Sequence, residues 1–111
     1  MGILYSVEIF YAKQNGTYIQ DSYFFCSFSQ NEHILFVFDV LQIKKTKKCT
    51  KDYVEIIDSS FGRTIGRFCR LRQIHGNLVT FGNKAIVRFY TNSQKVRSGF
   101  SLRYQAGIQR T

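Results

Sequence analysis

Residues 49–69 read CTKDYVEIIDSSFGRTIGRFC, and this stretch decides the fold. It begins and ends at a cysteine and contains a short strand pattern at 53–57, a polar turn and a second apolar run. Cysteines this far apart do not form a CxxC metal knuckle. They can close a disulfide loop, which would stabilise the fold by roughly 3 kcal/mol. No catalytic pattern occurs here, so we interpret the stretch as the cross-linked centre of a small extracellular β domain.

Strand patterns continue on both sides of this stretch. Runs rich in aromatic and β-branched residues favour strands. They recur about every ten residues, at 3–11, 23–28, 34–40, 53–57, 64–69, 77–81, 84–91 and 99–105. No 3.6-residue apolar period lasts beyond two turns. The pattern predicts an all-β fold, an antiparallel sandwich or barrel, and a length of 111 residues favours a single domain over 1–111.

The charge is strongly asymmetric. The chain carries a net charge of +9, and all its acids lie before Ser59. Such a surface attracts polyanions or an acidic protein, although scattered bases can also serve solubility alone. Residues 42–51 read as a basic loop. The candidate ligand-binding residues are Lys44, Lys45, Lys47, Lys48 and Lys51 of this loop, together with Arg70 and Arg72.

Other chemistry finds little support in the residues. His33 and His75 belong to no nucleophile motif, and the histidines and cysteines lack zinc-site spacing, so we expect no enzyme, no metal and no cofactor. The third cysteine, Cys26, is predicted to be unpaired or to cross-link two copies. Asn15 begins a glycosylation sequon, or a chance match to one. No run approaches the ~20 apolar residues of a membrane span, and residues 1–11 lack the features of a signal peptide.

An ordered set of motifs runs through residues 26–105: C-S-F at 26–28, F-D-V-x-Q-I at 38–43, C-x2-D-Y-V-E-I-x-D at 49–58, G-R-F-C at 66–69, G-N at 82–83, V-R-F at 87–89 and S-G-F-x-L-x-Y at 98–104. This set resembles the CUB domain family. The resemblance implies an antiparallel β-sandwich of jelly-roll type, an extracellular setting and a binding role. It also implies a disulfide between Cys49 and Cys69.

The chain departs from the family pattern in three places. The first cysteine of the family, which would pair with Cys26, is absent, and residues 1–20 are atypical. The positions that hold calcium in many CUB domains are Lys44, Asp52 and Asn92 here. Calcium needs several oxygen ligands, and a lysine offers none. We therefore expect no calcium site, and we hypothesise that the Lys44 ammonium takes the place of the ion beside Asp52.

Three functions remain open from the sequence. The first is calcium-independent recognition of an extracellular protein by loops at one end of the sandwich, with surface Tyr and Arg as anchors. The second is binding of a sulfated glycan such as heparin by the basic loop and the basic C-terminal half. The third, and weakest, is an intracellular nucleic-acid binder, which would keep all its thiols free. We expect a secreted protein or the ectodomain of a larger one.

Overall fold

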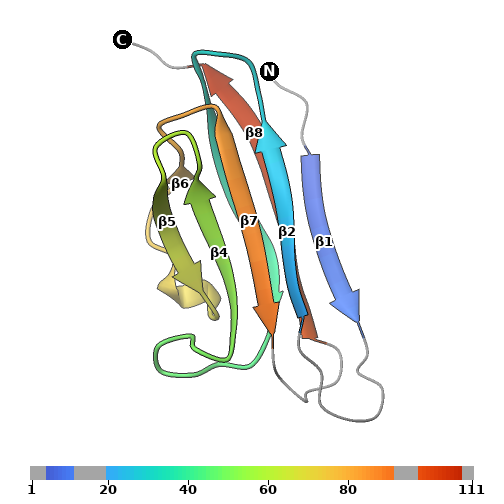
Figure 1. The fold of residues 1–111 in the computed structure, drawn as a ribbon. Coiled ribbons are helices and arrows are strands. Elements are labelled where there is room, and N and C mark those ends of the chain that lie inside the picture. The colour runs from blue at the N-terminus through green and yellow to red at the C-terminus, as the bar shows by residue number, and fades with distance from the viewer. Residues whose placement is uncertain (1–4, 12–19, 92–97, 109–111) are drawn as a thin grey trace.

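The computed structural model describes residues 5–11, 20–91 and 98–108, which form eight β-strands and one short 3-10 turn (Figure 1). The strands are β1 (Tyr5–Tyr11), β2 (Gln20–Ser27), β3 (Glu32–Gln42), β4 (Asp52–Asp58), β5 (Arg63–Phe68), β6 (Leu78–Val79), β7 (Lys84–Thr91) and β8 (Ser98–Ile108), and the 3-10 turn η1 covers Leu71–Gln73. Each run that the sequence predicted to be a strand forms one.

The strands make two antiparallel sheets. One has the order β1-β8-β3-β6 and the other β2-β7-β4-β5. Every observed strand pair is antiparallel. The two sheets lie face to face (Figure 1), so the predicted antiparallel β-sandwich is confirmed. Among the described residues, no helix has the length and apolar character needed to cross a membrane.

The core lies between the sheets and follows the alternation of each strand. In β7, Ala85, Val87 and Phe89 are buried, while the residues between them face outward. The rings of Phe89 on β7 and Phe100 on β8 meet edge to face, with centroids 5.1 Å apart. Because these strands belong to different sheets, this contact joins the two layers.

Most strand bounds differ from the predicted ones by one to three residues, and two of the differences have a visible structural basis. The strand expected at 77–81 is shorter in the structure and comprises only β6. After β6, the Thr80 hydroxyl replaces a backbone carbonyl as the acceptor for the Ile34 amide, at 2.8 Å. The same hydroxyl donates a hydrogen bond to the Gly82 carbonyl at 2.6 Å. The basic loop expected from residue 42 begins later. Gln42 still belongs to β3 and Ile43 is fully buried.

Candidate functional site

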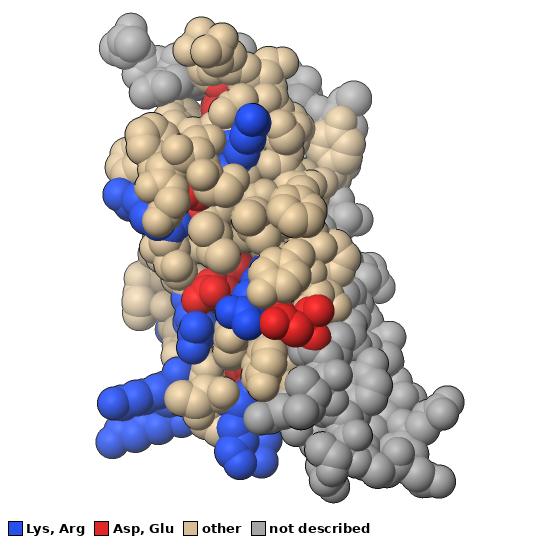
Figure 2. All heavy atoms as spheres, viewed as in Figure 1, with Lys and Arg blue, Asp and Glu red and all other residues tan. Residues whose placement is uncertain are grey.

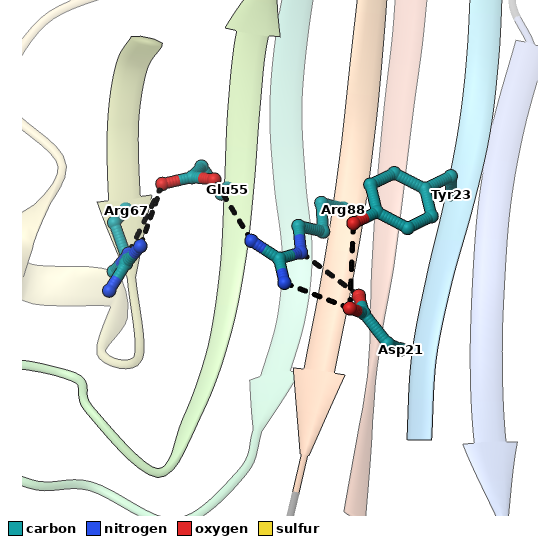
Figure 3. Close-up of polar contacts among 5 residues, drawn as sticks. All are labelled: Asp21, Tyr23, Glu55, Arg67 and Arg88. Atoms are coloured by element: carbon teal, nitrogen blue, oxygen red, sulfur yellow. Dashed lines mark hydrogen bonds and ion pairs between the residues drawn. The ribbon is translucent and has the colours of Figure 1, made fainter.

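The outer face of the β2-β7-β4-β5 sheet gathers the polar and aromatic side chains that point away from the core. Strand register sets their neighbours: Tyr23 of β2 lies opposite Arg88 of β7, Arg88 lies opposite Glu55 of β4, and Glu55 lies opposite Arg67 of β5. One row of side chains therefore crosses all four strands (Figure 3).

Opposite charges alternate along this row. Arg88 binds the Asp21 carboxylate through Nε–Oδ1 and Nη2–Oδ2 contacts of 2.9 and 2.8 Å. Its Nη1 lies 3.9 Å from Oε1 of Glu55. The other oxygen of Glu55 accepts a hydrogen bond from Nε of Arg67 at 3.2 Å and forms an ion pair with its Nη2 at 3.1 Å. The result is the continuous ladder Asp21–Arg88–Glu55–Arg67, shown by the dashed lines of Figure 3.

The ion pair between Asp21 and Arg88 shifts the pKa values of both groups. The hydrogen bond from Arg88 holds the pKa of Asp21 below its ordinary value, and the same bond raises the pKa of Arg88. A charge-assisted, two-point contact of this kind is stronger than a neutral hydrogen bond and fixes the orientation of both groups. The guanidinium of Arg88 is therefore fixed in place before any ligand arrives.

Tyrosine rings support the arginines. Tyr53 and Tyr90 stack with centroids 5.3 Å apart, and the Arg67 guanidinium lies 3.9 Å above the Tyr53 ring. Arg88 lies 5.5 to 5.7 Å from the Tyr23, Tyr53 and Tyr90 rings. These are cation–π distances. We call Asp21, Tyr23, Tyr53, Glu55, Arg67, Arg88 and Tyr90 the tyrosine–arginine face.

An apolar row borders this face. Phe25 of β2 lies opposite Ile86 of β7, which lies opposite Ile57 of β4. Phe25 is 76% exposed and Tyr23 is 48% exposed. A phenylalanine left this far in water is a strong candidate for contact with a partner when it adjoins further apolar surface.

The predicted basic residues gather at one end of the sandwich, which we call the basic tip. Its members are Lys44, Lys45, Lys47, Lys48, Lys51, Arg70 and Arg72. The five lysines and Arg72 are exposed, and Arg70 is half-buried. Figure 2 shows lysine and arginine atoms projecting at the lower end of the molecule, below the mixed charges of the sheet face.

The disulfide predicted between Cys49 and Cys69 is confirmed, with Cα atoms 5.5 Å apart. It joins the lysine loop to the segment that carries Arg70 and Arg72. Arg70 adds a second link, because its Nη1 donates to the Thr46 carbonyl at 3.1 Å. The two basic segments are therefore parts of one surface. The intracellular alternative required free thiols throughout, and Cys49 and Cys69 are not free.

The calcium positions are only partly described. Asn92, like the sequon residue Asn15, lies outside the described residues. Asp52 is fully buried, and its Oδ2 accepts from the backbone amide of Lys44 at 3.2 Å, while the Lys44 side chain is exposed. The Lys44 backbone amide is thus one partner of Asp52, and the contact with the Lys44 ammonium stays a prediction. Within residues 5–11, 20–91 and 98–108, no three His, Cys, Asp or Glu residues are grouped to hold a metal.

Cys26 is a free thiol in the core, only 3% exposed. Burial raises its pKa, and the nearby Tyr104 hydroxyl opposes this with a hydrogen bond. Both predicted states, an unpaired thiol and a cross-link between copies, stay predictions; the cross-link would require the sulfur to leave the core. His33 contacts the Thr80 carbonyl at 2.8 Å, and His75 is exposed.

The sequence reasoning missed the tyrosine–arginine face. It identified tyrosine and arginine as anchors but could not say which ones. One signal was present: the alternation of 84–91 puts Arg88 and Tyr90 on the outer side. What the sequence did not show is the register that brings Arg88 between Asp21 and Glu55, residues that lie 67 and 33 positions away along the chain.

Comparison with known proteins gives a consistent result. The sequence model of the CUB domain matches residues 11–104. Cubilin from Homo sapiens is 34% identical over 73 residues, 65% of this chain and 2% of cubilin. The dorsal-ventral patterning protein tolloid from Drosophila melanogaster is 34% identical over 73 residues, 64% of this chain and 7% of tolloid. This chain thus spans only a small part of these relatives.

Solved structures agree on the fold. The CUB1-EGF-CUB2 domain of human MASP-1/3 superposes with a TM-score of 0.73 at 15% identity, covering 94% of this chain and 42% of that one. The corresponding domains of rat MASP-1 give a TM-score of 0.70 at 14% identity, covering 95% of this chain and 41% of the rat chain.

Proposed function

This chain belongs to the CUB domain family, and we propose that it is a non-catalytic module that recognises an extracellular protein through its tyrosine–arginine face. CUB domains mediate protein–protein interactions. One observation carries the proposal: tyrosine and arginine, two of the residues most enriched at interface hot spots, occupy adjoining positions on a single sheet face.

The face is preorganised for binding. Ion pairs and ring contacts fix Arg67 and Arg88, so these long side chains lose little further freedom when a partner docks. The exposed rings of Tyr23 and Phe25 add apolar contact area beside them. The proposed surface therefore lies on a sheet face and not at the end loops that the sequence suggested.

Charge on this face favours a particular kind of partner. Two carboxylates and two guanidinium groups alternate, so the ladder itself carries no net charge. A surface of this kind selects a partner with matching alternate charges rather than a uniform polyanion. The remaining excess of positive charge lies elsewhere, much of it at the basic tip.

The test is a panel of purified secreted and cell-surface ectodomains, measured by surface plasmon resonance against the immobilised domain. Tyr23→Ser and Arg67→Ala should each lower the affinity for a true partner by about tenfold or more, as hot-spot substitutions do. Arg103→Ala is the matched control: Arg103 is 42% exposed against 40% for Arg67, and it pairs with Asp39 at 2.7 Å on the other sheet. Partners that depend on Arg103 and not on Arg67, or no partner at all, would contradict the proposal.

We propose that this chain is extracellular, as its CUB-domain relatives are. The Cys49–Cys69 disulfide supports the proposal, because disulfides persist in oxidising compartments. We also propose that residues 1–111 form one domain: β1, from the atypical N-terminal part, pairs with β8 along its whole length. Asn15 would be a glycosylation site in such a setting.

We propose that the domain binds its partner without calcium, and the surroundings of the Asp52 carboxylate support this. This carboxylate is buried and already binds the Lys44 amide, and the exposed lysine beside it supplies a positive charge in place of an oxygen ligand. Melting curves in calcium chloride and in EDTA should coincide. A calcium-dependent rise of several degrees in the melting temperature would overturn this expectation.

A second function is favoured by the basic tip, and we propose it beside the first: binding of a sulfated glycan. Seven cations from two chain segments meet at this end, and Asp52, beside them, is buried. On a heparin column the domain should elute well above the physiological ~0.15 M salt. The variant with Lys47→Ala and Lys48→Ala should elute earlier, and Arg103→Ala should not. Elution near physiological salt would contradict this role.

A further inference from the structure

We propose that a shallow hollow in the basic tip is a subsite for one sulfated sugar residue. This inference rests on the glycan role proposed above and adds a specific ligand unit to it. The hollow measures about 390 Å³ and is lined by Leu41, Lys45, Arg70, Leu71 and Arg72. Its volume lies within the roughly 300–1,000 Å³ that small-ligand sites occupy.

The hollow combines an apolar wall with a charged rim. Leu41 is nearly buried at 5% exposure, whereas Leu71 is 45% exposed and presents its side chain to the solvent. Lys45, Arg70 and Arg72 supply three cations around these two leucines. The chemistry suits a group that is apolar on one side and anionic at its edges.

The walls of the hollow are fixed by contacts beneath them. Arg70 is held by its bond to the Thr46 carbonyl. The Gln73 side chain accepts from the backbone amides of Cys69 and Arg70 at 2.9 and 3.0 Å, which positions the start of η1. The disulfide ties the same segment to the loop that carries Lys45. The Arg70 side chain and the two backbone segments that carry Lys45 and Arg72 are therefore held around the hollow before a ligand binds, which reduces the entropy lost on binding.

A sulfated sugar fits this chemistry better than the other polyanions. A pyranose ring has C–H faces that can pack on leucine, and its sulfate groups lie at the ring edge, where guanidinium groups bind oxyanions at two points. Single-stranded nucleic acid relies on aromatic side chains for base stacking, and none of the five described lining residues is aromatic. A linear polyphosphate offers no apolar surface for Leu71 to contact.

The experiment compares a heparin-derived octasaccharide with inorganic polyphosphate by titration calorimetry at one ionic strength. Leu71→Ser should weaken octasaccharide binding roughly fivefold to tenfold, the effect of losing one partly buried leucine contact. It should leave polyphosphate binding within twofold. The control is Lys47→Ala, which removes a charge outside the hollow. It should weaken the binding of both ligands by a similar factor. Because Leu71 is half exposed, the Leu71→Ser variant should keep the wild-type melting temperature. Arg72→Gln is a second test of the hollow and should weaken octasaccharide binding more than Lys47→Ala does.

Each outcome bears on a separate claim. Suppose that the wild-type protein binds the octasaccharide, but Leu71→Ser changes the binding of both ligands equally or of neither. If Arg72→Gln also weakens octasaccharide binding no more than Lys47→Ala does, the subsite is wrong and the glycan role stands. If the wild-type protein does not bind the octasaccharide, the glycan role and the subsite are both wrong. Selective loss of octasaccharide binding in the Leu71 and Arg72 variants supports the subsite.

Discussion

The guanidinium of Arg88 binds the carboxylate of Asp21 at two points, 2.9 and 2.8 Å, across the neighbouring strands β7 and β2. Both groups are partly exposed, at 25% and 33%, so solvent screening limits what the pair contributes. A double-mutant cycle with Asp21→Asn and Arg88→Gln should give a coupling energy of about 1 kcal/mol in urea unfolding. A coupling near zero would show that the two-point contact does not persist in solution.

The same pair predicts a pH dependence. Arg88 holds the pKa of Asp21 below its ordinary value, so the folded state binds the Asp21 proton less readily than the unfolded chain does. The stabilisation is therefore fully present above the unfolded pKa, about 3.9, and is lost as the pH falls through the lowered folded pKa. The stability difference between wild type and Asp21→Asn should be constant from pH 5 to 8 and shrink below about pH 4. A difference that grows on acidification would contradict the assigned direction.

Removing the disulfide should weaken the whole sandwich. The cross-link joins two cysteines with a sequence separation of 20. A disulfide that closes a loop of this size stabilises a fold by roughly 3 kcal/mol. Replacing Cys49 and Cys69 by Ala should lower the free energy of unfolding by about that amount. Reductant should lower the stability of the wild type and leave the double variant unchanged. A wild type with three titratable thiols in denaturant would show that the cross-link is absent.

Cys26 should behave as an inert core thiol. Its 3% exposure and the burial that raises its pKa both slow attack on a thiol reagent. Native protein should react with iodoacetamide far more slowly than denatured protein, which should show one free thiol per chain. A covalent dimer on a non-reducing gel, or rapid labelling of the native protein, would require the sulfur to reach the surface.

Much of the fold could be predicted because its signals are local. Runs of aromatic and β-branched residues predicted the strands, including the run at 84–91 that forms β7, and the cysteine spacing with its flanking motifs predicted the cross-link. A strand was predicted at 77–81, but its shortening to Leu78–Val79 was not, since the shortening involves the hydrogen bonds of the Thr80 hydroxyl. A side-chain hydrogen bond between residues 46 positions apart leaves no local pattern.

The candidate site was harder to predict than the fold. The basic tip is visible in the sequence as a run of lysines, although the joining of Arg70 to Thr46 is not. The tyrosine–arginine face depends on pairing between β2, β7, β4 and β5. Register is set by tertiary packing, so Asp21, Glu55 and Arg88 each look like ordinary surface charges in the sequence.

Recognition through the tyrosine–arginine face is tested most directly by nuclear magnetic resonance. Amide shifts of 15N-labelled domain would be followed while a partner from the ectodomain panel is added. The account predicts that the largest shifts fall at residues 21–25, 53–57, 67 and 86–90, which lie together on one sheet face. Shifts confined to the basic tip, or to the outer face of the β1-β8-β3-β6 sheet, would contradict it.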